Sequence, residues 1–213
     1  MPRNKEKNEL AIKQSKECIL NASLFLFSIY GYQLVGIDDI AKVSNCSRGL
    51  IYHYFKDKEN LFNDMMHLVA EKMYSITEAI DYSQKAEIAL RELIDSLLSK
   101  LNSSELNKFD NNYACMFYLI LNLHLQRDFV PKPRVDISNR PLERKRLFEI
   151  IYYLIEKGQK EKVFYKGDPK AYTISILSML KGLSYTKIYL KEKMTSPTTD
   201  MVMNIVKGGN NEA

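Results

Sequence analysis

The stretch Ile19–Leu61 decides the fold, and it reads ILNASLFLFSIYGYQLVGIDDIAKVSNCSRGLIYHYFKDKENL. Apolar residues recur at helical spacing as far as Tyr30. Gly31 follows where a helix C-terminus needs a left-handed residue, which glycine adopts without a Cβ penalty. Tyr32 is placed to fold back on Phe27, a contact typical of such a cap. We therefore predict a first helix that ends near Tyr30.

A second, short helix is predicted to begin near Gly36 and to end near Ser44. Asp38 and Asp39 fall in its first turn, where negative charge suits the positive end of the helix dipole. Asn45 then occupies a tight turn, because asparagine tolerates a left-handed conformation better than other non-glycine residues. The pattern predicts a helix, a sharp turn and a further helix.

The third helix is predicted to begin after Ser47, whose hydroxyl can accept an orphan backbone N–H. The residues that can pack inward are apolar: Leu50, Ile51 and Phe55. The residues that can point outward are polar: Arg48, Tyr52 and His53. Two short helices joined by such a turn match the helix-turn-helix, in which the second helix enters the major groove of DNA.

This segment resembles the DNA-binding part of the TetR family of bacterial transcriptional regulators. The matching residues are Ile19-Leu20, Ala22, Phe27, Gly31-Tyr32, Ile40-Ala41, Ser47, Gly49, Tyr52, Phe55, Lys58-Glu59 and Leu61. The sequence departs from the family pattern at Val35 and Gly36, where many members carry phosphate-binding Thr or Ser. Leu50 and Asn45 also differ from the usual small polar residue and glycine. These departures leave the sequence of the DNA target open.

The resemblance implies two sets of DNA contacts. Base contacts are expected from Arg48, Gly49, Tyr52 and His53. Arg48 is the residue expected to read guanine, since its fork matches the O6/N7 pair. Phosphate contacts are expected from the backbone N–H groups of Gly36 and Ile37 and from the side chains of Tyr54, Lys56 and Lys58. The alternative is that Tyr52 and Tyr54 only pack.

Beyond this stretch, apolar periodicity predicts helices over 58–80, 85–101, 113–125, 142–161 and 168–191. We expect the apolar segment 113–125 to cross the middle of the body, Phe129–Pro141 to form a loop, and Gly208–Ala213 to be disordered. No strand-like alternation stands out. The predicted fold is all-α, with about nine helices.

Two domains are predicted. Residues 1–57 form a helix-turn-helix DNA-binding domain with a basic N-terminal arm, and residues 58–213 form a ligand-binding and dimerisation domain. The resemblance implies that the last two long helices pair across a two-fold axis as a four-helix bundle. The expected interface residues are Leu147, Ile151, Leu154, Ile176, Leu180 and Leu183. The helix that begins at Lys58 is the expected lever between the domains.

The second domain is rich in Met, Tyr and Phe. Adaptable methionines and flat rings suit a cavity for an apolar or aromatic effector. The candidate lining residues are Met66, Met73, Met116, Phe117, Tyr153 and Met179. Ordinary core packing is the alternative for each of them.

The net charge of +5 permits nucleic-acid binding without requiring it. The basic residues before the first motif, Arg3, Lys5, Lys7, Lys13 and Lys16, suggest either a loose arm along DNA or a frayed terminus. A later basic run, Arg140, Arg144, Lys145 and Arg146, suggests a solvated helix face or a second DNA contact. Three widely spaced cysteines, no 18-residue apolar run and no signal-peptide core together predict a cytoplasmic protein.

Neither His67 nor His124 has partners at metal-ligand spacing, and no catalytic or phosphate-binding motif appears. We therefore expect no metal, no cofactor and no catalytic residues. The leading hypothesis is a dimeric repressor that binds a palindromic operator and is released by a small effector. The alternative is an architectural or partner-recruiting DNA-binding protein without an effector. An α-helical enzyme or carrier is a third hypothesis.

Overall fold

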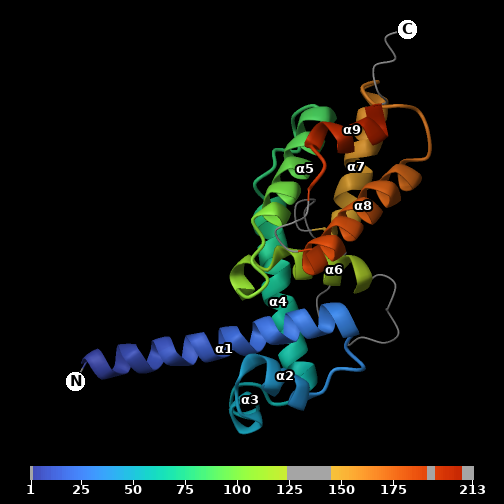
Figure 1. Ribbon diagram of the computed structural model, residues 1–213. Helices are drawn as coiled ribbons and strands as arrows, with labels where there is room; N and C mark the ends of the chain where they lie inside the picture. Colours follow the sequence, from blue (N-terminus) through green and yellow to red (C-terminus); the bar gives the residue numbers. More distant parts are fainter. Residues whose placement is uncertain (1, 124–144, 191–194, 208–213) are drawn as a thin grey trace. The chain divides into compact units, whose positions relative to one another are not determined.

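The computed structural model describes residues 2–123, 145–190 and 195–207, and these residues form α-helices and one 3-10 turn without any strand (Figure 1). The elements are α1 (Pro2–Tyr30), α2 (Ile37–Ser44), α3 (Arg48–Tyr54), α4 (Lys58–Thr77), α5 (Ala86–Asn102), η1 (Phe109–Asn111), α6 (Tyr113–Leu123), α7 (Leu147–Lys160), α8 (Pro169–Leu190) and α9 (Thr199–Lys207). The predicted all-α fold is confirmed. No helix in the described ranges is long and apolar enough to cross a membrane.

Several predictions fall on residues outside those that the structure describes. They concern the loop Phe129–Pro141, the tail Gly208–Ala213, His124, and the first two residues of the later basic run, Arg140 and Arg144.

The chain divides into two compact units that do not follow the linear order of the sequence. The head unit comprises residues 1–69 and 104–133, and the body unit comprises residues 70–103 and 134–213. Helix α4 therefore contributes residues to both. The boundary between a DNA-binding domain and a ligand-binding and dimerisation domain, at residues 57 and 58, stays a prediction.

The core of the head unit is built from the apolar faces of α1 to α4. Ile19 and Leu24 of α1, Ile40 of α2, Ile51 of α3 and Leu61 of α4 are all fully buried. Burying such side chains stabilises the unit by roughly 1.5–3 kcal/mol each. Helices α2 and α3, of 8 and 7 residues, have little stability alone and are thus held by the core that they share with α1 and α4.

The end of α1 has the predicted cap. Gly31 adopts a φ of 80° and its N–H donates to the carbonyl of Phe27 at 3.1 Å. The rings of Phe27 and Tyr32 lie 5.5 Å apart in a tilted arrangement, and both contact Phe62 of α4 edge-on, at 5.5 and 4.9 Å between ring centres. This aromatic cluster fixes the start of α4 against the end of α1.

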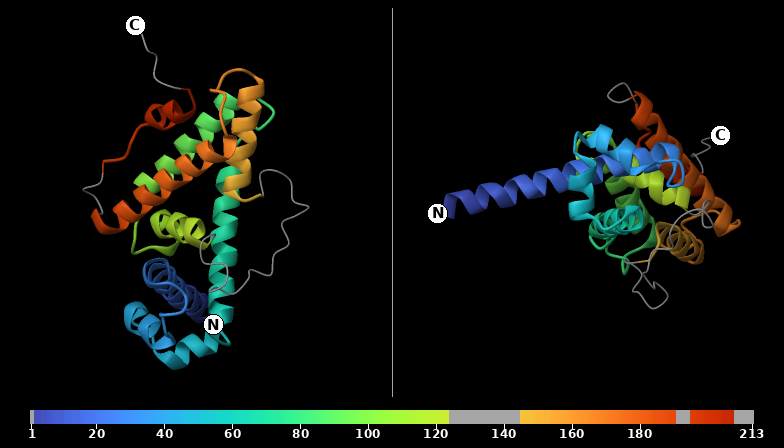
Figure 2. Two further views of the ribbon diagram at one scale, coloured as in Figure 1. Left: turned by 90° about the vertical axis from the view of Figure 1, so that its right-hand side faces the viewer. Right: turned by 90° about the horizontal axis from the view of Figure 1, so that it is seen from below.

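The beginning of α1 differs from the prediction. Residues 2–18 continue the helix, so the expected loose arm or frayed terminus is wrong for this segment. The N-terminal half of α1 extends away from the other helices of the head unit (Figure 2), and the side chains of residues 7–14 are exposed. Lys7 and Lys13 thus lie on a rod rather than on an irregular chain.

Helix α6 belongs to the head unit, where it packs on α1. Asn112, which is fully buried, donates from Nδ2 to the carbonyl of Leu106 at 2.9 Å and to Oδ1 of Asn21 at 3.1 Å. Ser104 Oγ accepts from the N–H of Ala114 at 3.0 Å. The expectation that this apolar helix crosses the body is therefore corrected, because the helix clusters with the head unit and packs on α1.

The body unit is a bundle of α5, α7, α8 and α9, and the C-terminal part of α4 also belongs to it (Figure 1). Leu90, Leu93 and Leu97 of α5 pack in its core with Ile150 and Ile155 of α7. The predicted start of α8 is confirmed: Asp168 Oδ1 accepts from the N–H of Lys170 at 2.9 Å, and Pro169 is the first helical residue.

Helix α9 was not predicted. Its apolar residues Val202, Met203 and Val206 are buried, and the helix contacts α5 and α8. Asp200 accepts from Arg91 at 2.6 Å, and Asp95 accepts from the Thr199 hydroxyl at 2.8 Å. A helix of nine residues has little stability alone, so packing on α5 decides its formation.

Candidate nucleic-acid interface

The helix-turn-helix is formed by α2, the turn at Asn45 and α3. Asn45 adopts the left-handed conformation, with φ 53° and ψ 36°, and ends α2. The N–H of Cys46 donates to the carbonyl of Ala41 at 3.1 Å. Ser47 Oγ accepts from the N–H of Leu50 at 3.1 Å and caps α3. The left-handed turn at Asn45 and the cap at Ser47, both predicted from the sequence, are confirmed.

Helix α3 is anchored by one face and exposes the other. Ile51 and Phe55 are buried, whereas Leu50 is only half-buried. The four residues expected to contact bases are exposed, namely Arg48, Gly49, Tyr52 and His53. Among the described residues outside its own stretch of helix, a methyl group on Gly49 would meet only the Ser47 hydroxyl, at 4.0 Å, so they leave the space at Gly49 open.

Arg48 is held by neighbours on two helices. Its Nη1 lies 3.2 Å from each carboxylate oxygen of Asp38 on α2, and its guanidinium lies 5.6 Å from the centre of the Tyr52 ring. Hydrogen bonding to Tyr52 and the charge of Asp38 raise the pKa of Arg48 above its ordinary value, so the group stays cationic. Sequence reasoning placed Asp38 only at a helix dipole and missed this pairing across the turn.

The side chains expected to bind phosphate lie in different environments. Lys56 is exposed. Tyr54 is half-buried, with the ammonium of Lys16 at 5.4 Å from its ring centre. Lys58 is half-buried and lies 4.3 Å from the ring centre of Tyr32. Burial lowers the pKa of Lys58, although the charge of Asp39 opposes that change. Lys16, one of the basic residues noted before the first motif, is thus a further cation near this surface.

One N–H group that was expected to bind phosphate already donates a hydrogen bond within the chain. The N–H of Gly36 donates to the carboxylate of Asp39 at 2.8 Å, which closes the first turn of α2. A phosphate would have to displace this carboxylate and would be repelled by it. The expected contact of Gly36 is therefore corrected for this conformation, and that of Ile37 stays a prediction.

No cluster of His, Cys, Asp and Glu that could hold a metal ion exists among the described residues. What the geometry does offer is a short exposed helix with a paired arginine at its start and cations around it. Such a surface can contact base edges and phosphates.

The comparison with known proteins agrees with this geometry. Residues 19–65 match the family model described as "Bacterial regulatory proteins, tetR family". The segment of residues 19–65 belongs to the TetR family. The chain is 36% identical over 58 residues to an uncharacterised HTH-type transcriptional regulator, YhgD of Bacillus subtilis, and this match covers 27% of this chain and 30% of YhgD.

Solved structures of TetR proteins share the fold over most of their length. A TetR-like transcriptional regulator from Rhodococcus sp. RHA1 has a TM-score of 0.60 at 17% identity, covering 88% of this chain and 91% of that one. AibR, solved in complex with isovaleryl coenzyme A and operator DNA, has a TM-score of 0.57 at 16% identity, covering 87% and 92%.

The residues expected to pair two copies of this chain are mostly buried within one copy. Leu147, Ile151, Leu154, Ile176 and Leu180 are at most 8% exposed, and only Leu183 is half-buried. Contacts among α5, α7 and α8 of the same chain cover them. This interface prediction is therefore corrected: the periodic apolar stripe marks the core of the body unit rather than a surface for a partner.

The predicted pocket residues are divided between the two units. Met66, Met116 and Phe117 belong to the head unit, and Met73, Tyr153 and Met179 belong to the body unit. Met73, Met116 and Phe117 are buried, Met66 and Met179 are half-buried, and Tyr153 is exposed. Their role in binding an effector stays a prediction.

Proposed function

We propose that this chain is a regulator of the TetR type, which binds specific DNA sequences, acts as a homodimeric repressor and is released by a small effector. The observation that carries the proposal is that helix α3 buries its apolar face and exposes its polar face. Ile51 and Phe55 are buried, while Arg48, Tyr52 and His53 are exposed on a helix closed by Asn45 and Ser47. This arrangement is that of a helix held rigidly for reading a groove.

The base contacts belong to the exposed residues at the start and middle of α3. Arg48 presents a planar fork that matches the O6 and N7 atoms of guanine, and Gly49 lets the helix backbone approach the bases. Tyr54, Lys56 and Lys58 supply phosphate contacts, which fix the position of the helix without selecting a sequence. The N–H of Ile37 completes this set.

A dimer follows from a second exposed stripe. Ile174, Ser178, Gly182, Tyr185 and Tyr189 recur at spacings of three and four on α8, and all five are exposed. In the part of the chain that the structure describes, a methyl group on Gly182 would meet no atom within 4 Å beyond its own stretch of helix, so a partner helix has room to approach there. We assign the dimer contact to this stripe. Two reading helices about 34–36 Å apart then bind a near-palindrome.

The effector proposal rests on similarity and on α4. The solved structure of AibR holds isovaleryl coenzyme A and operator DNA, which supports a ligand-responsive role for this chain. An apolar or aromatic effector suits the Met and Phe side chains listed above, with Met73 on the part of α4 that belongs to the body unit. A ligand regulates only if it binds the DNA-bound and free conformations with different affinities.

The test is selection of random double-stranded DNA by the purified protein, followed by sequencing. The proposal expects an enriched inverted repeat. It also expects that Arg48→Ala reduces affinity for the selected site by about 5–150-fold, corresponding to the roughly 1–3 kcal/mol of one base contact. Folded protein that enriches no sequence, with or without added cell extract, would contradict the proposal and favour a partner-binding role.

A further inference from the structure

We propose that Asp38 is a specificity-determining residue that directs Arg48 toward base edges and away from phosphates. The inference rests on the DNA-binding function proposed above and deepens it. It starts from one geometric relationship: Asp38 and Arg48 lie on different helices, ten residues apart, and meet across the turn that joins them.

The geometry of the pair leaves most of the guanidinium available. Both contacts to Asp38, at 3.2 Å, use the same nitrogen, Nη1. An arginine side chain has five N–H donors, and the contact with Asp38 uses none of those on Nη2 and Nε. Two parallel donors are what the O6 and N7 atoms of guanine require. Asp38 can therefore hold the side chain without consuming the fork that reads the base.

Tyr52 restricts the same side chain from a second direction. Its ring centre lies 5.6 Å from the Arg48 guanidinium, at a distance typical of cation–π contact. Arginine otherwise has a large rotamer freedom, which costs free energy to lose on binding. A guanidinium that is already held between Asp38 and Tyr52 loses less rotamer freedom when the protein binds DNA.

The ion pair between Arg48 and Asp38 contributes little to the stability of the fold. The side chains of Arg48 and Asp38 are 60% and 66% exposed, and exposed ion pairs contribute about 0–1 kcal/mol. The adjacent Asp39 differs, because its carboxylate accepts the N–H of Gly36 and closes the helix. Asp38 can thus be changed with small effect on the fold, whereas Asp39 cannot.

The charge of Asp38 acts unequally on the two kinds of DNA contact. Non-specific binding is driven by cations that neutralise phosphates, and a carboxylate beside Arg48 weakens that attraction. A guanine edge carries no net charge, so the directed hydrogen bonds to it are less affected. Asp38 therefore lowers affinity for random DNA more than affinity for the correct site.

The test compares Asp38→Asn with a matched variant, Asp64→Asn, which removes the same charge from an exposed position on α4 of the head unit. Binding is measured by fluorescence anisotropy at several salt concentrations. The duplexes are the site selected by the wild-type protein, versions of it with each guanine replaced, and a random sequence. Unchanged circular dichroism and melting temperature establish that the variants are folded, and Asp38→Ser repeats the measurement with a residue that suits the first turn.

The expected result is that Asp38→Asn binds random DNA more tightly and reduces the ratio of selected-site to random affinity by about 5-fold or more, the lower end of one base contact. Its discrimination falls at one guanine. Asp64→Asn keeps the wild-type ratio. In an Arg48→Ala background, Asp38→Asn changes no base preference, because the residue acts through Arg48.

Two results would overturn the inference in distinguishable ways. A wild-type protein that selects a site, together with an Asp38→Asn variant that behaves like Asp64→Asn, would overturn the role of Asp38 alone. A wild-type protein without any sequence preference would overturn the proposed function, and the inference with it.

Discussion

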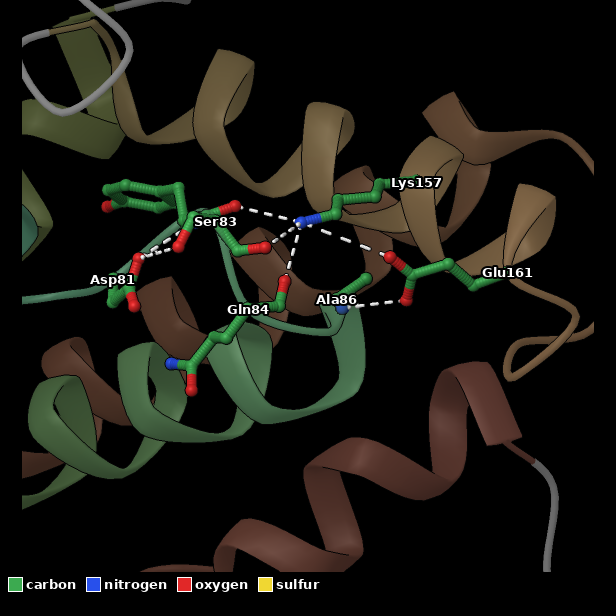
Figure 3. A network of polar contacts seen from close by, with 7 residues as sticks. Asp81, Ser83, Gln84, Ala86, Lys157 and Glu161 are labelled. Atoms are coloured by element: carbon green, nitrogen blue, oxygen red, sulfur yellow. Dashed lines mark hydrogen bonds and ion pairs between the residues drawn. The ribbon is translucent and has the colours of Figure 1, made fainter.

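The ammonium of Lys157 on α7 lies 2.8 Å from the carbonyl oxygen of Tyr82, in the link between α4 and α5 (Figure 3). The same nitrogen lies 3.4 Å from the carbonyl oxygen of Ser83 and 2.5 Å from that of Gln84. Glu161, one turn along α7, accepts from the N–H of Ala86 at 2.8 Å. Two side chains of α7 therefore satisfy the backbone that begins α5.

Lys157→Met is expected to destabilise the body unit by about 1–3 kcal/mol. Methionine keeps the apolar stem but removes a charged donor, so the carbonyls of residues 82–84 lose their partner. Urea unfolding measures the loss, and hydrogen exchange at the Ala86 amide should become faster. Lys160→Met, at an exposed position of the same helix, is the control. Equal stability of both variants would contradict the structural role of Lys157.

Gly158→Ala is expected to destabilise the protein by about 1–3 kcal/mol, the usual cost of overpacking. A methyl group at this position would lie 2.0 Å from Cδ2 of Phe164, whose ring is buried against α7. Thermal unfolding measures the effect. The double variant Gly158→Ala with Phe164→Leu should recover part of the loss, since the smaller side chain can shift. If the stability changes of the two single variants simply add in the double variant, the clash with Phe164 is not the cause of the lost stability.

The local features of the chain were predictable, and the partners of its apolar faces were not. Gly31, Asn45 and Ser47 depend on their own backbone conformations, so residue type alone indicated the cap, the turn and the helix start. Helical periodicity located the stripe containing Ile151 and Leu154, but it cannot say whether a helix of the same chain or of a second copy covers the stripe. The same limit explains why α6 was assigned to the wrong part of the molecule.

In the candidate DNA-binding surface, too, features within one helix were predictable and contacts between helices were not. Exposed and buried faces of α3 followed from spacing within one helix. The pairing of Arg48 with Asp38 and the approach of Lys16 to Tyr54 depend on how helices meet, which spacing along the chain does not encode. Helix α9 escaped prediction because its three buried residues need α5 and α8 to cover them.

Cys115 should make the protein less stable at alkaline pH. Burial raises its pKa to about 11 from 9.0. Below pH 9 the thiol is protonated in both the folded and the unfolded chain. Between pH 9 and 11 the unfolded chain releases this proton while the folded chain retains it, so stability falls by about 1.4 kcal/mol per pH unit. Urea unfolding at pH 8–10.5 should show a shallower decline for Cys115→Ala than for the wild type, and equal slopes would contradict this origin.

The exposed α8 stripe gives a prediction about association. The rings of Tyr185 and Tyr189 lie 4.5 Å apart and are 43% and 56% exposed. Replacing both by lysine places two like charges in the proposed dimer contact, so sedimentation velocity should show monomers. Lysines at the exposed Leu10 and Ile12 of α1 are the control and should leave the dimer intact. Dimers that persist in the α8 variant would place the contact on another surface.

Lys56 should contribute to DNA affinity without contributing to sequence preference. It is exposed directly after α3 and is expected to neutralise a phosphate. Lys56→Gln should therefore weaken binding to the selected site and to random duplex by the same factor, and reduce the slope of log affinity against log salt by about 0.9. Lys170→Gln, at an exposed position on α8, is the charge-matched control and should keep the wild-type slope. A change of base preference in Lys56→Gln would mean that this lysine reads bases, whereas an equal loss in both variants would trace the effect to net charge alone.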